Sequence, residues 1–205
     1  MLAHLSVTDY LDRTASGDPV PGGGSAAALN AALAAGLIEM VARLTVGRKG
    51  FEAVDAEMRA VADRAAALRA KLTGDIDRDS QAYAQVLAAF ARPKATPEEK
   101  TTRAQAIQEA FRQAALVPLG VARDALQAMA LGRQVIAGGN PNAASDGAAG
   151  VLAARMAARA AVYNVKINLG SIKDEGFTAK LRAEADRLER EADALENEIL
   201  KLMKL

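Results

Sequence analysis

Residues 21–45 read PGGGSAAALNAALAAGLIEMVARLT, a proline and three glycines followed by a run made mostly of Ala and Leu. Because Ala is the best helix former, the run predicts a helix from Ser25 to about Thr45. Ala buries little apolar area, so such a helix suits places where other helices approach closely. The stretch therefore predicts the central helix of an all-helical protein, with a binding surface at its N-terminal end.

The PGGGS segment alone is a weak signal for a ligand. It lacks the Lys of a P-loop and the spacing of a dinucleotide fingerprint. A tight turn before a helix explains it more simply than anion binding does.

The composition restricts both the core and the chemistry. Hydrophobic residues make up 51% of the 205 residues, but only 3% are aromatic, so the core is built from small and aliphatic side chains. The chain has no Cys and a single His, His4, which excludes a thiolate metal site and a multi-His metal site within one chain. The net charge of +1 gives no reason to expect nucleic acid or a membrane surface as a partner. No signal peptide or membrane span is recognisable, so we expect a cytoplasmic protein.

Apolar periodicity predicts helices throughout and no strands. A short helix capped by Ser6 carries Val7, Tyr10 and Leu11 inward, and a very long one covers residues 52–90. The next begins with a capping box at Thr96 and contains Pro118, where we expect a kink. Another runs from a cap at Asn142 or Ser145 to about Leu169. With the C-terminal helix, these elements predict a single domain, residues 1–205, folded as an all-α bundle of five to six helices.

One polar residue interrupts the apolar stripe of the helix over residues 52–90. The buried stripe that carries Leu72, Ile76, Tyr83 and Phe90 calls for an apolar residue at position 79, which is Asp79. Asp75 and Asp77 fall off this stripe and are expected to face water. A carboxylate on an apolar stripe must be paired, hydrogen-bonded, protonated or next to a cavity. An ion pair with an Arg of a neighbouring helix and a functional site both remain open.

Other polar residues cluster at the breaks between helices. Asn140, Asn142, Ser145 and Asp146 precede or open a helix, and capping is the favoured explanation for them. Four cations lie in or near breaks, where they are solvated or hold an anionic ligand: Arg48, Lys49, Lys94 and Lys100. Asn164 and Asn168 are one turn apart and share a helix face.

The C-terminal segment carries Leu at heptad spacing. Leu181, Leu188, Leu195 and Leu202 alternate with Ala185, Ala192 and Ile199. This seam is typical of coiled coils. Packing against the same bundle and pairing between chains are both consistent with it.

Six segments occur in an order that is specific when they are taken together. They are PGGGSAAAL (21–29), LTVGRKGF (44–51), DIDRDSQAYAQVLAAF (75–90), RPKATPEEKTTR (92–103), GNPNAASD (139–146) and NVKINLGSIKDEGF (164–177). From about residue 11 to residue 177 the chain resembles the cyclodeaminase/cyclohydrolase family of tetrahydrofolate enzymes. Arg92 departs from the family pattern, which often has an apolar residue before Pro-Lys. The transferase half of longer members has no counterpart, so we expect any transferase activity to come from another polypeptide.

The resemblance implies an all-helical subunit that forms a homodimer, with a folate site in a groove between subunits. It places the family's catalytic aspartate at Asp79, the residue that interrupts the stripe. Further positions match family motifs and are candidates for substrate binding: Gly22, Gly23, Gly24, Ser25, Thr45, Arg48, Lys94, Arg103, Asn140, Ser145, Asp146, Asn164 and Asn168. We expect Asp146 and the Asn residues to position the pterin or the bridge. The glycines and the basic residues are expected to hold the pterin or the glutamate tail.

The resemblance also implies chemistry at the N5–C–N10 bridge of tetrahydrofolate. The first hypothesis is a formiminotetrahydrofolate cyclodeaminase, which forms the 5,10-methenyl compound and ammonia. The alternative is a methenyltetrahydrofolate cyclohydrolase, which adds water to give 10-formyltetrahydrofolate. Neither reaction requires a metal or a redox cofactor. Hypotheses of other classes are a non-catalytic helical adaptor that assembles through the C-terminal heptads, and a binding protein with a degenerate site.

Overall fold

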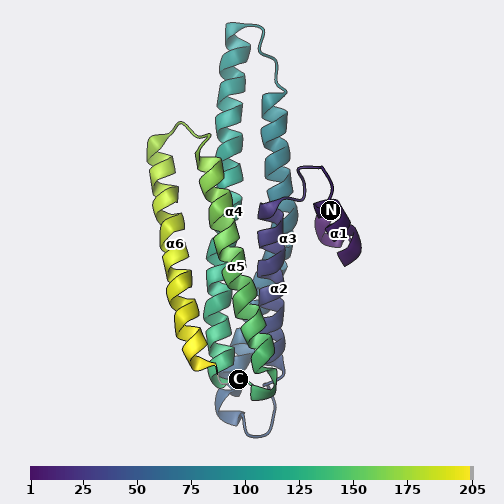
Figure 1. The fold of residues 1–205 in the computed structure, drawn as a ribbon, viewed down its shortest axis with the longest axis vertical. Coiled ribbons are helices and arrows are strands. Elements are labelled where there is room, and N and C mark those ends of the chain that lie inside the picture. The colour runs from purple at the N-terminus through teal and green to yellow at the C-terminus, as the bar shows by residue number, and fades with distance from the viewer. Residues whose placement is uncertain (204–205) are drawn as a thin grey trace.

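The computed structural model describes residues 1–203, and all of its regular elements in that range are helices (Figure 1). Its main elements are α1 (Val7–Thr14), α2 (Gly23–Arg43), α3 (Asp55–Phe90), α4 (Pro97–Gly138), α5 (Ala144–Leu169) and α6 (Glu175–Leu202). Short 3₁₀ turns occupy Leu2–His4, Glu52–Val54 and Pro141–Ala143. The prediction of an all-α bundle is confirmed, and α4 continues as one helix through Pro118.

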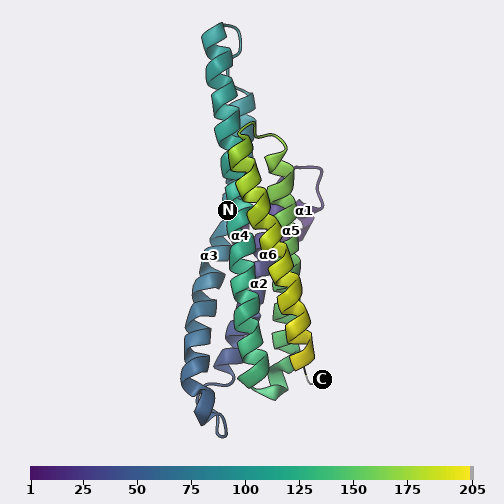
Figure 2. The ribbon, with the colours of Figure 1, turned by 90° about the vertical axis from the view of Figure 1, so that its left-hand side faces the viewer.

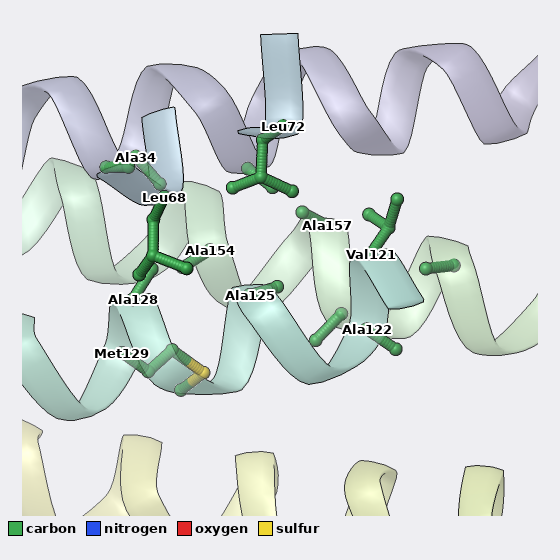
Figure 3. Close-up of a cluster of buried hydrophobic side chains, with 14 of the residues drawn as sticks. Ala34, Leu68, Leu72, Val121, Ala122, Ala125, Ala128, Met129, Ala154 and Ala157 are labelled. Carbon is green, nitrogen blue, oxygen red and sulfur yellow. The ribbon is translucent and has the colours of Figure 1, made fainter. Parts of the chain in front are cut away.

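Helix α2 packs between α3 and α5 (Figure 1). Its Ala side chains are almost all buried, and the core continues through the small residues of α4 and α5 (Figure 3). The backbone of α5 reaches that of α2 so closely that a side chain at Gly150 would lie 3.3 Å from the Ala34 carbonyl oxygen. Small side chains allow this approach, as the sequence predicts for the two Ala-rich helices.

Helices α3 and α4 extend beyond the other helices as a projecting hairpin (Figures 1 and 2). A separate small core joins them there, formed by Ala82, Val86, Ala89, Ala110 and Ala114. Tyr83 and Phe90 were expected on the buried stripe but are 39% and 46% exposed. That expectation is wrong because each helix of the hairpin packs only on the other, which leaves the rest of its surface to solvent.

Two aspartates that were expected to face water are instead buried. Asp75 pairs with Arg78 across 2.7 Å, and Asp77 accepts the backbone N–H of Leu2. The N-terminal segment that follows Leu2 carries α1, which buries Tyr10 but leaves Val7 and Leu11 exposed. The expectation that all three of these α1 side chains face inward is therefore wrong for Val7 and Leu11, because this short helix lies at the edge of the bundle (Figure 1).

The heptad seam of α6 packs on the chain's own α4 and α5 (Figure 2). Leu181, Ala185, Leu188, Ala192 and Ile199 are all buried in this contact. Ion pairs such as Arg123–Glu184 (2.7 Å) flank the seam. Of the two explanations that the heptads left open, the structure supports packing within the bundle.

Two helices are long and apolar enough to cross a membrane by length and composition alone. They are α2 and α4, and 61% of the apolar stretch in each is buried inside the bundle. Core helices of bundle proteins pass the same test, so these stretches are weak signals. The expected absence of a membrane partner stays a prediction.

Candidate active site

Asp79 on α3 meets Ser25 at the first turn of α2. The Ser25 hydroxyl lies 2.9 Å from Asp79 Oδ2, 3.1 Å from the Ile76 carbonyl oxygen and 3.0 Å from Ser80 Oγ. Ser25 is fully buried and Asp79 is half-buried. Within residues 1–203 no Lys or Arg forms an ion pair with Asp79, so the structure does not support the ion-pair hypothesis.

Burial raises the pKa of the Asp79 carboxyl above its ordinary value, because a low-dielectric environment disfavours the charged form. Hydrogen bonding to the Ser25 hydroxyl and backbone acts in the opposite direction. The pKa of the Asp79 carboxyl is therefore closer to neutral pH than that of a solvated aspartate, as a group that transfers protons requires.

The glycine run makes this approach possible. A Cβ built at Gly24 would overlap the Asp79 carboxylate, and one at Gly23 would lie 3.3 Å from Asn164 Nδ2. The N-cap of α2 is Gly22, which has no side chain to bind the free N–H groups of the first turn. The positive end of the helix dipole therefore faces the carboxylate and any anionic or polar ligand beside it.

Asn164 and Asn168 approach this region from α5. Asn164 donates to the Ala160 carbonyl oxygen at 2.9 Å, and Asn168 donates to those of Ala114 (2.8 Å) and Asn164 (2.9 Å). Asn164 thus lies beside Gly23, while Asn168 ties α5 to α4 one turn further on. We call Gly22–Ser25, Asp79, Asn164 and Asn168 the aspartate half-site.

A second group of predicted residues lies at the opposite end of α2. Thr45 Oγ1 accepts the Asn140 N–H at 2.9 Å, and the Asn140 side chain reaches the Leu44 carbonyl oxygen at 3.4 Å. Asp146 is in the first turn of α5, and Ser145 and Arg48 are exposed. We call Thr45, Arg48, Asn140, Ser145 and Asp146 the asparagine half-site.

The capping predictions in this region are partly wrong. The N-cap of α5 is Ala143, rather than Asn142 or Ser145. The cap is displaced because a 3₁₀ turn precedes the helix, and the Asn140 side chain caps that turn by accepting the Asn142 N–H at 3.0 Å.

The two half-sites are far apart within one chain. Helix α2 has 21 residues, which at 1.5 Å per residue separates its ends by about 30 Å. Lys94 and Arg103 occupy a third place, at the tip of the projecting hairpin, where the Arg103 guanidinium lies over the Phe90 ring at 5.5 Å. The structure therefore brings together the residues of each half-site but does not join the half-sites to each other or to Lys94.

Sequence reasoning missed two residues beside Asp79. The Ser80 hydroxyl lies 3.0 Å from the Ser25 hydroxyl. Burial raises the pKa of Tyr10, and the charge of Asp79 raises it further. Periodicity placed Tyr10 on an inward face, but nothing in the sequence connects residue 10 with residue 79. In the same described range, no three His, Asp or Glu side chains converge as metal ligands do.

The geometry defines an all-helical protein with a half-buried carboxylate at the open N-terminus of a small-residue helix, an arrangement suited to proton transfer. The family model of formiminotransferase-cyclodeaminase matches residues 6–187, and the chain belongs to this family.

Several relatives support this assignment. The chain is 38% identical over 204 residues to methenyltetrahydrofolate cyclohydrolase of Methylorubrum extorquens, covering all of this chain and 98% of that protein. It is 37% identical over 191 residues to the formimidoyltransferase-cyclodeaminase of Sus scrofa, covering 93% of this chain but only 35% of the longer protein. The crystal structure of formiminotetrahydrofolate cyclodeaminase from Thermotoga maritima superposes with a TM-score of 0.88 at 29% identity, covering 98% and 97% of the two chains.

Proposed function

We propose that this protein is a tetrahydrofolate one-carbon enzyme that acts on the N5–C–N10 bridge, with Asp79 as the general acid and base. The observation that carries the proposal is the Ser25–Asp79 pair, a carboxylate with a raised pKa at the glycine-rich start of α2. Membership of the family and the names of its members supply the substrate class.

Both candidate reactions pass through a tetrahedral carbon between two nitrogens. In cyclodeamination, N10 attacks the formimino carbon, the N10 proton is removed and ammonia leaves after protonation. In cyclohydrolysis, a water molecule attacks the bridge carbon of the methenyl cation, and Asp79 takes a proton from that water. The C–N5 bond of the tetrahedral intermediate then breaks as Asp79 returns the proton to N5, and loss of the hydroxyl proton to solvent leaves the formyl group on N10. The fixed carboxylate also stabilises the positive charge of the amidinium bridge.

Formiminotetrahydrofolate cyclodeaminase is the leading candidate, because the Thermotoga maritima protein of that name matches the structure over nearly the whole chain. Methenyltetrahydrofolate cyclohydrolase is the second candidate, because the Methylorubrum extorquens relative of that name matches end to end at 38% identity. The two reactions differ in nucleophile and leaving group, and Asp79 serves both.

A spectrophotometric assay with each substrate decides between the candidates. Growth of methenyl absorbance with release of ammonia from 5-formiminotetrahydrofolate identifies a cyclodeaminase. Accelerated loss of methenyl absorbance from 5,10-methenyltetrahydrofolate identifies a cyclohydrolase. A folded protein that changes neither substrate contradicts the proposal and favours the adaptor hypothesis.

The proposal includes a homodimer, because α2 and α5 each expose a row of apolar side chains. Leu29, Leu33, Met40 and Leu44 recur at steps of four and seven along α2, and α5 repeats the pattern with Leu152, Met156, Tyr163 and Ile167. Such spacing puts each set on one side of its helix, and the two helices pack side by side. An apolar face of this length on a soluble protein marks an interaction surface.

A second copy of the chain is the occupant that completes the site. A two-fold axis across the middle of α2 and α5 sets the two subunits antiparallel. The two half-sites of one chain lie about 30 Å apart along the face. In the antiparallel dimer, the aspartate half-site of one subunit meets the asparagine half-site of its partner. The folate would bind in the groove between them, and the basic residues Arg48 and Lys94 would be available to its carboxylates.

Mixing two inactive variants tests this arrangement. We expect Asp79→Asn and Asn140→Ala each to inactivate a homodimer, while a mixed dimer keeps one intact site. Random reassembly of equal amounts should recover about a quarter of the normal rate, because half of the dimers are mixed and each has one of its two sites intact. No recovery after verified subunit exchange would place both half-sites in the same subunit.

The remaining features of the proposal are simple to test. Both reactions move protons, water or ammonia but no electrons, so we propose that neither a redox cofactor nor a metal takes part. Turnover that survives exhaustive treatment with a chelator supports this, and a rate restored only by added metal contradicts it. The cytoplasmic location and the absence of nucleic acid and membrane partners stay predictions, supported by the net charge of +1.

A further inference from the structure

The side of α3 that faces α2 continues beyond the start of α2. Arg69 pairs with Glu39 of α2 at 2.8 Å, and two turns later the Ile76 carbonyl oxygen accepts the Ser25 hydroxyl at 3.1 Å. Residues seven apart lie on one side of a helix, so Tyr83 belongs to the same side, two turns after Ile76. Ser25 is in the first turn of α2, so α2 ends before it reaches Tyr83.

Three large side chains on this part of α3 are exposed. Tyr83, Leu87 and Phe90 are 39%, 50% and 46% exposed, because the small core of the hairpin packs on other positions of α3. They follow Asp79 at steps of four, four and three residues and therefore share its side of the helix. We call Tyr83, Leu87 and Phe90 the hairpin stripe. It is an apolar surface that begins one turn after the Asp79 carboxylate.

Helix α5 bounds the same region. Asn164 lies beside Gly23, and one turn later Asn168 donates to the carbonyl oxygen of Ala114 in α4 at 2.8 Å. Ala114 belongs to the small core of the hairpin. Both α3 and α5 run in the direction opposite to α2, so the residues that follow Asp79 and Asn164 lie beyond its first turn (Figure 1). The region past the start of α2 therefore has an apolar surface on α3 and amide side chains on α5.

The charge along the hairpin changes from negative at its base to positive at its tip. Asp79 is at the base, and residues 80–90 contain no charged side chain. The loop and the start of α4 carry two carboxylates, Glu98 and Glu99, and four cations, Arg92, Lys94, Lys100 and Arg103. The guanidinium of Arg103 lies over the Phe90 ring at 5.5 Å, at the far end of the hairpin stripe. A ligand that fits this surface has a cationic or polar group, then an apolar body, then an anionic group.

We propose that the hairpin stripe binds the aminobenzoyl ring of the folate substrate, with Tyr83 against the ring and the N5–C–N10 bridge at Asp79. This inference rests on the proposed function. In a tetrahydrofolate the ring is bonded directly to N10, and the glutamate carboxylates lie beyond the ring. Tyr83 is about 6 Å along α3 from Asp79, within reach of a ring attached to a bridge at Asp79. The ring then meets apolar side chains, and the carboxylates extend toward the cations of the tip.

Only one direction along this side of α3 is open to the ring. Toward Ile76 the helix is covered by α2, which places Gly24 against the Asp79 carboxylate and bonds the Ser25 hydroxyl to the Ile76 carbonyl oxygen. Toward Tyr83 the side chains are exposed. A substrate whose bridge is at Asp79 therefore extends its ring along the hairpin, away from α2.

Steady-state kinetics test the contact with Tyr83. Tyr83→Ala should raise KM about tenfold and change kcat by less than about threefold, because the ring keeps this contact in the transition state. Tyr83→Phe keeps the aromatic ring and should keep the normal KM. Gln85→Ala is the matched control, since Gln85 is exposed on the opposite side of the same turn. An active protein with an unchanged KM in Tyr83→Ala would overturn the inference alone, whereas turnover of neither substrate would overturn the proposed function itself.

A binding experiment tests the contact without turnover. Protein labelled with 3-fluorotyrosine has three ¹⁹F signals, which Tyr→Phe variants assign to Tyr10, Tyr83 and Tyr163. p-Aminobenzoylglutamate should shift the Tyr83 signal and leave that of the buried Tyr10 in place, and Lys94→Ala should weaken its binding. 6-Methyltetrahydropterin, which lacks the ring, should not shift the Tyr83 signal. A Tyr83 signal that responds only to the pterin, or to neither probe, would overturn the proposal.

Sedimentation distinguishes a substrate surface from a subunit interface. Leu87 is 50% exposed, so Leu87→Glu should leave the subunit folded. We expect it to keep the oligomeric state of the unchanged protein and to raise KM, because the new carboxylate repels an anionic substrate and removes apolar contact. Dissociation of an assembly by Leu87→Glu would assign the hairpin stripe to a partner subunit and overturn the proposal.

Discussion

Gly24 and Asp79 are in such close contact that a side chain at position 24 would occupy the space of the carboxylate. A Cβ there would overlap all three atoms of the Asp79 carboxyl group. The contact joins the first turn of α2 to the middle of α3, 55 residues later in the chain. The glycine is therefore required by the packing of the site, in addition to any freedom it gives the turn.

Replacing Gly24 tests this contact directly. Gly24→Ala should displace Asp79, reduce turnover by about 100-fold or more and lower the free energy of unfolding by about 1–3 kcal/mol through overpacking. Gly120→Ala is the matched control, because nothing lies within 4 Å of a Cβ at that position in α4. The control should keep full activity and gain up to about 1 kcal/mol of stability from the better helix former. Equal activity in the two variants would contradict the assigned role of Gly24.

Asp79→Asn should abolish most of the chemistry and leave the fold intact. The amide can still accept from Ser25 but cannot transfer a proton, so we expect kcat to fall by about 100- to 10,000-fold. Circular dichroism should show the same helix content as in the unchanged protein. Asp63→Asn, at an exposed position of the same helix, provides the comparison and should retain its rate. Near-normal turnover of Asp79→Asn would reject the assignment.

The same variant should be more stable than the natural protein at neutral pH. Burial raises the pKa of folded Asp79 above its unfolded value, so the native carboxyl binds its proton more tightly. Above the pKa of the folded state, the ionised Asp79 carboxylate lowers the free energy of unfolding. This loss shrinks as the pH falls through the folded-state pKa and ends near the unfolded-state pKa of about 3.9. We expect Asp79→Asn to add about 1 kcal/mol at pH 7, as substitutions in strained sites commonly do. Urea unfolding from pH 7 to pH 4 should show the gain shrinking; a constant difference contradicts this cause.

Breaking the apolar face of α2 and α5 should remove both assembly and activity. Ile167 is 75% exposed, so Ile167→Glu should leave the subunit folded while placing a charge in the proposed interface. We expect a monomer in sedimentation and a rate reduced by more than about tenfold. Leu200→Glu is the matched control, since Leu200 is 49% exposed on α6, which is not part of this face. A fully active Ile167→Glu monomer would exclude a site shared between subunits.

The seam of α6 should contribute to subunit stability and not to assembly. Leu188 is buried against the bundle, so Leu188→Ala should lower the free energy of unfolding by about 2–5 kcal/mol without changing the oligomeric state. Leu200→Ala, at a position that is 49% exposed, should cost far less. Dissociation of an assembly by Leu188→Ala would show that the seam pairs between chains.

Regular patterns in the sequence predicted the fold well. The spacing of apolar residues located the helices, and the Thr96–Glu99 capping box forms as predicted. Asp79 was found because its neighbours along the stripe are apolar, and the structure places it against Ser25. These features depend on residues close in sequence, where periodicity and capping rules apply directly.

Features that depend on distant segments were missed. Asp77 lies off the stripe but is buried by the N-terminal segment, whose Leu2 N–H it accepts. Asp75 is buried on another side of α3, where it pairs with Arg78 and lies near Asp124 of α4. Phe90 follows the stripe, yet the hairpin extends past the other helices and leaves it exposed. The grouping of Thr45 with Asn140, about 30 Å from Asp79, requires the length and direction of α2, which periodicity does not supply.

The length of α2 has a consequence for how this protein tolerates insertions and deletions. One residue added within α2 would advance its C-terminal end by about 1.5 Å and rotate it by about 100° relative to Ser25. Thr45 and its neighbours would then turn away from the face on which Leu33 and Ile167 lie. The tip of the hairpin has no such phase to keep, so chain length should vary more readily at residues 91–96 than between Gly23 and Arg43, provided that Lys94 is kept.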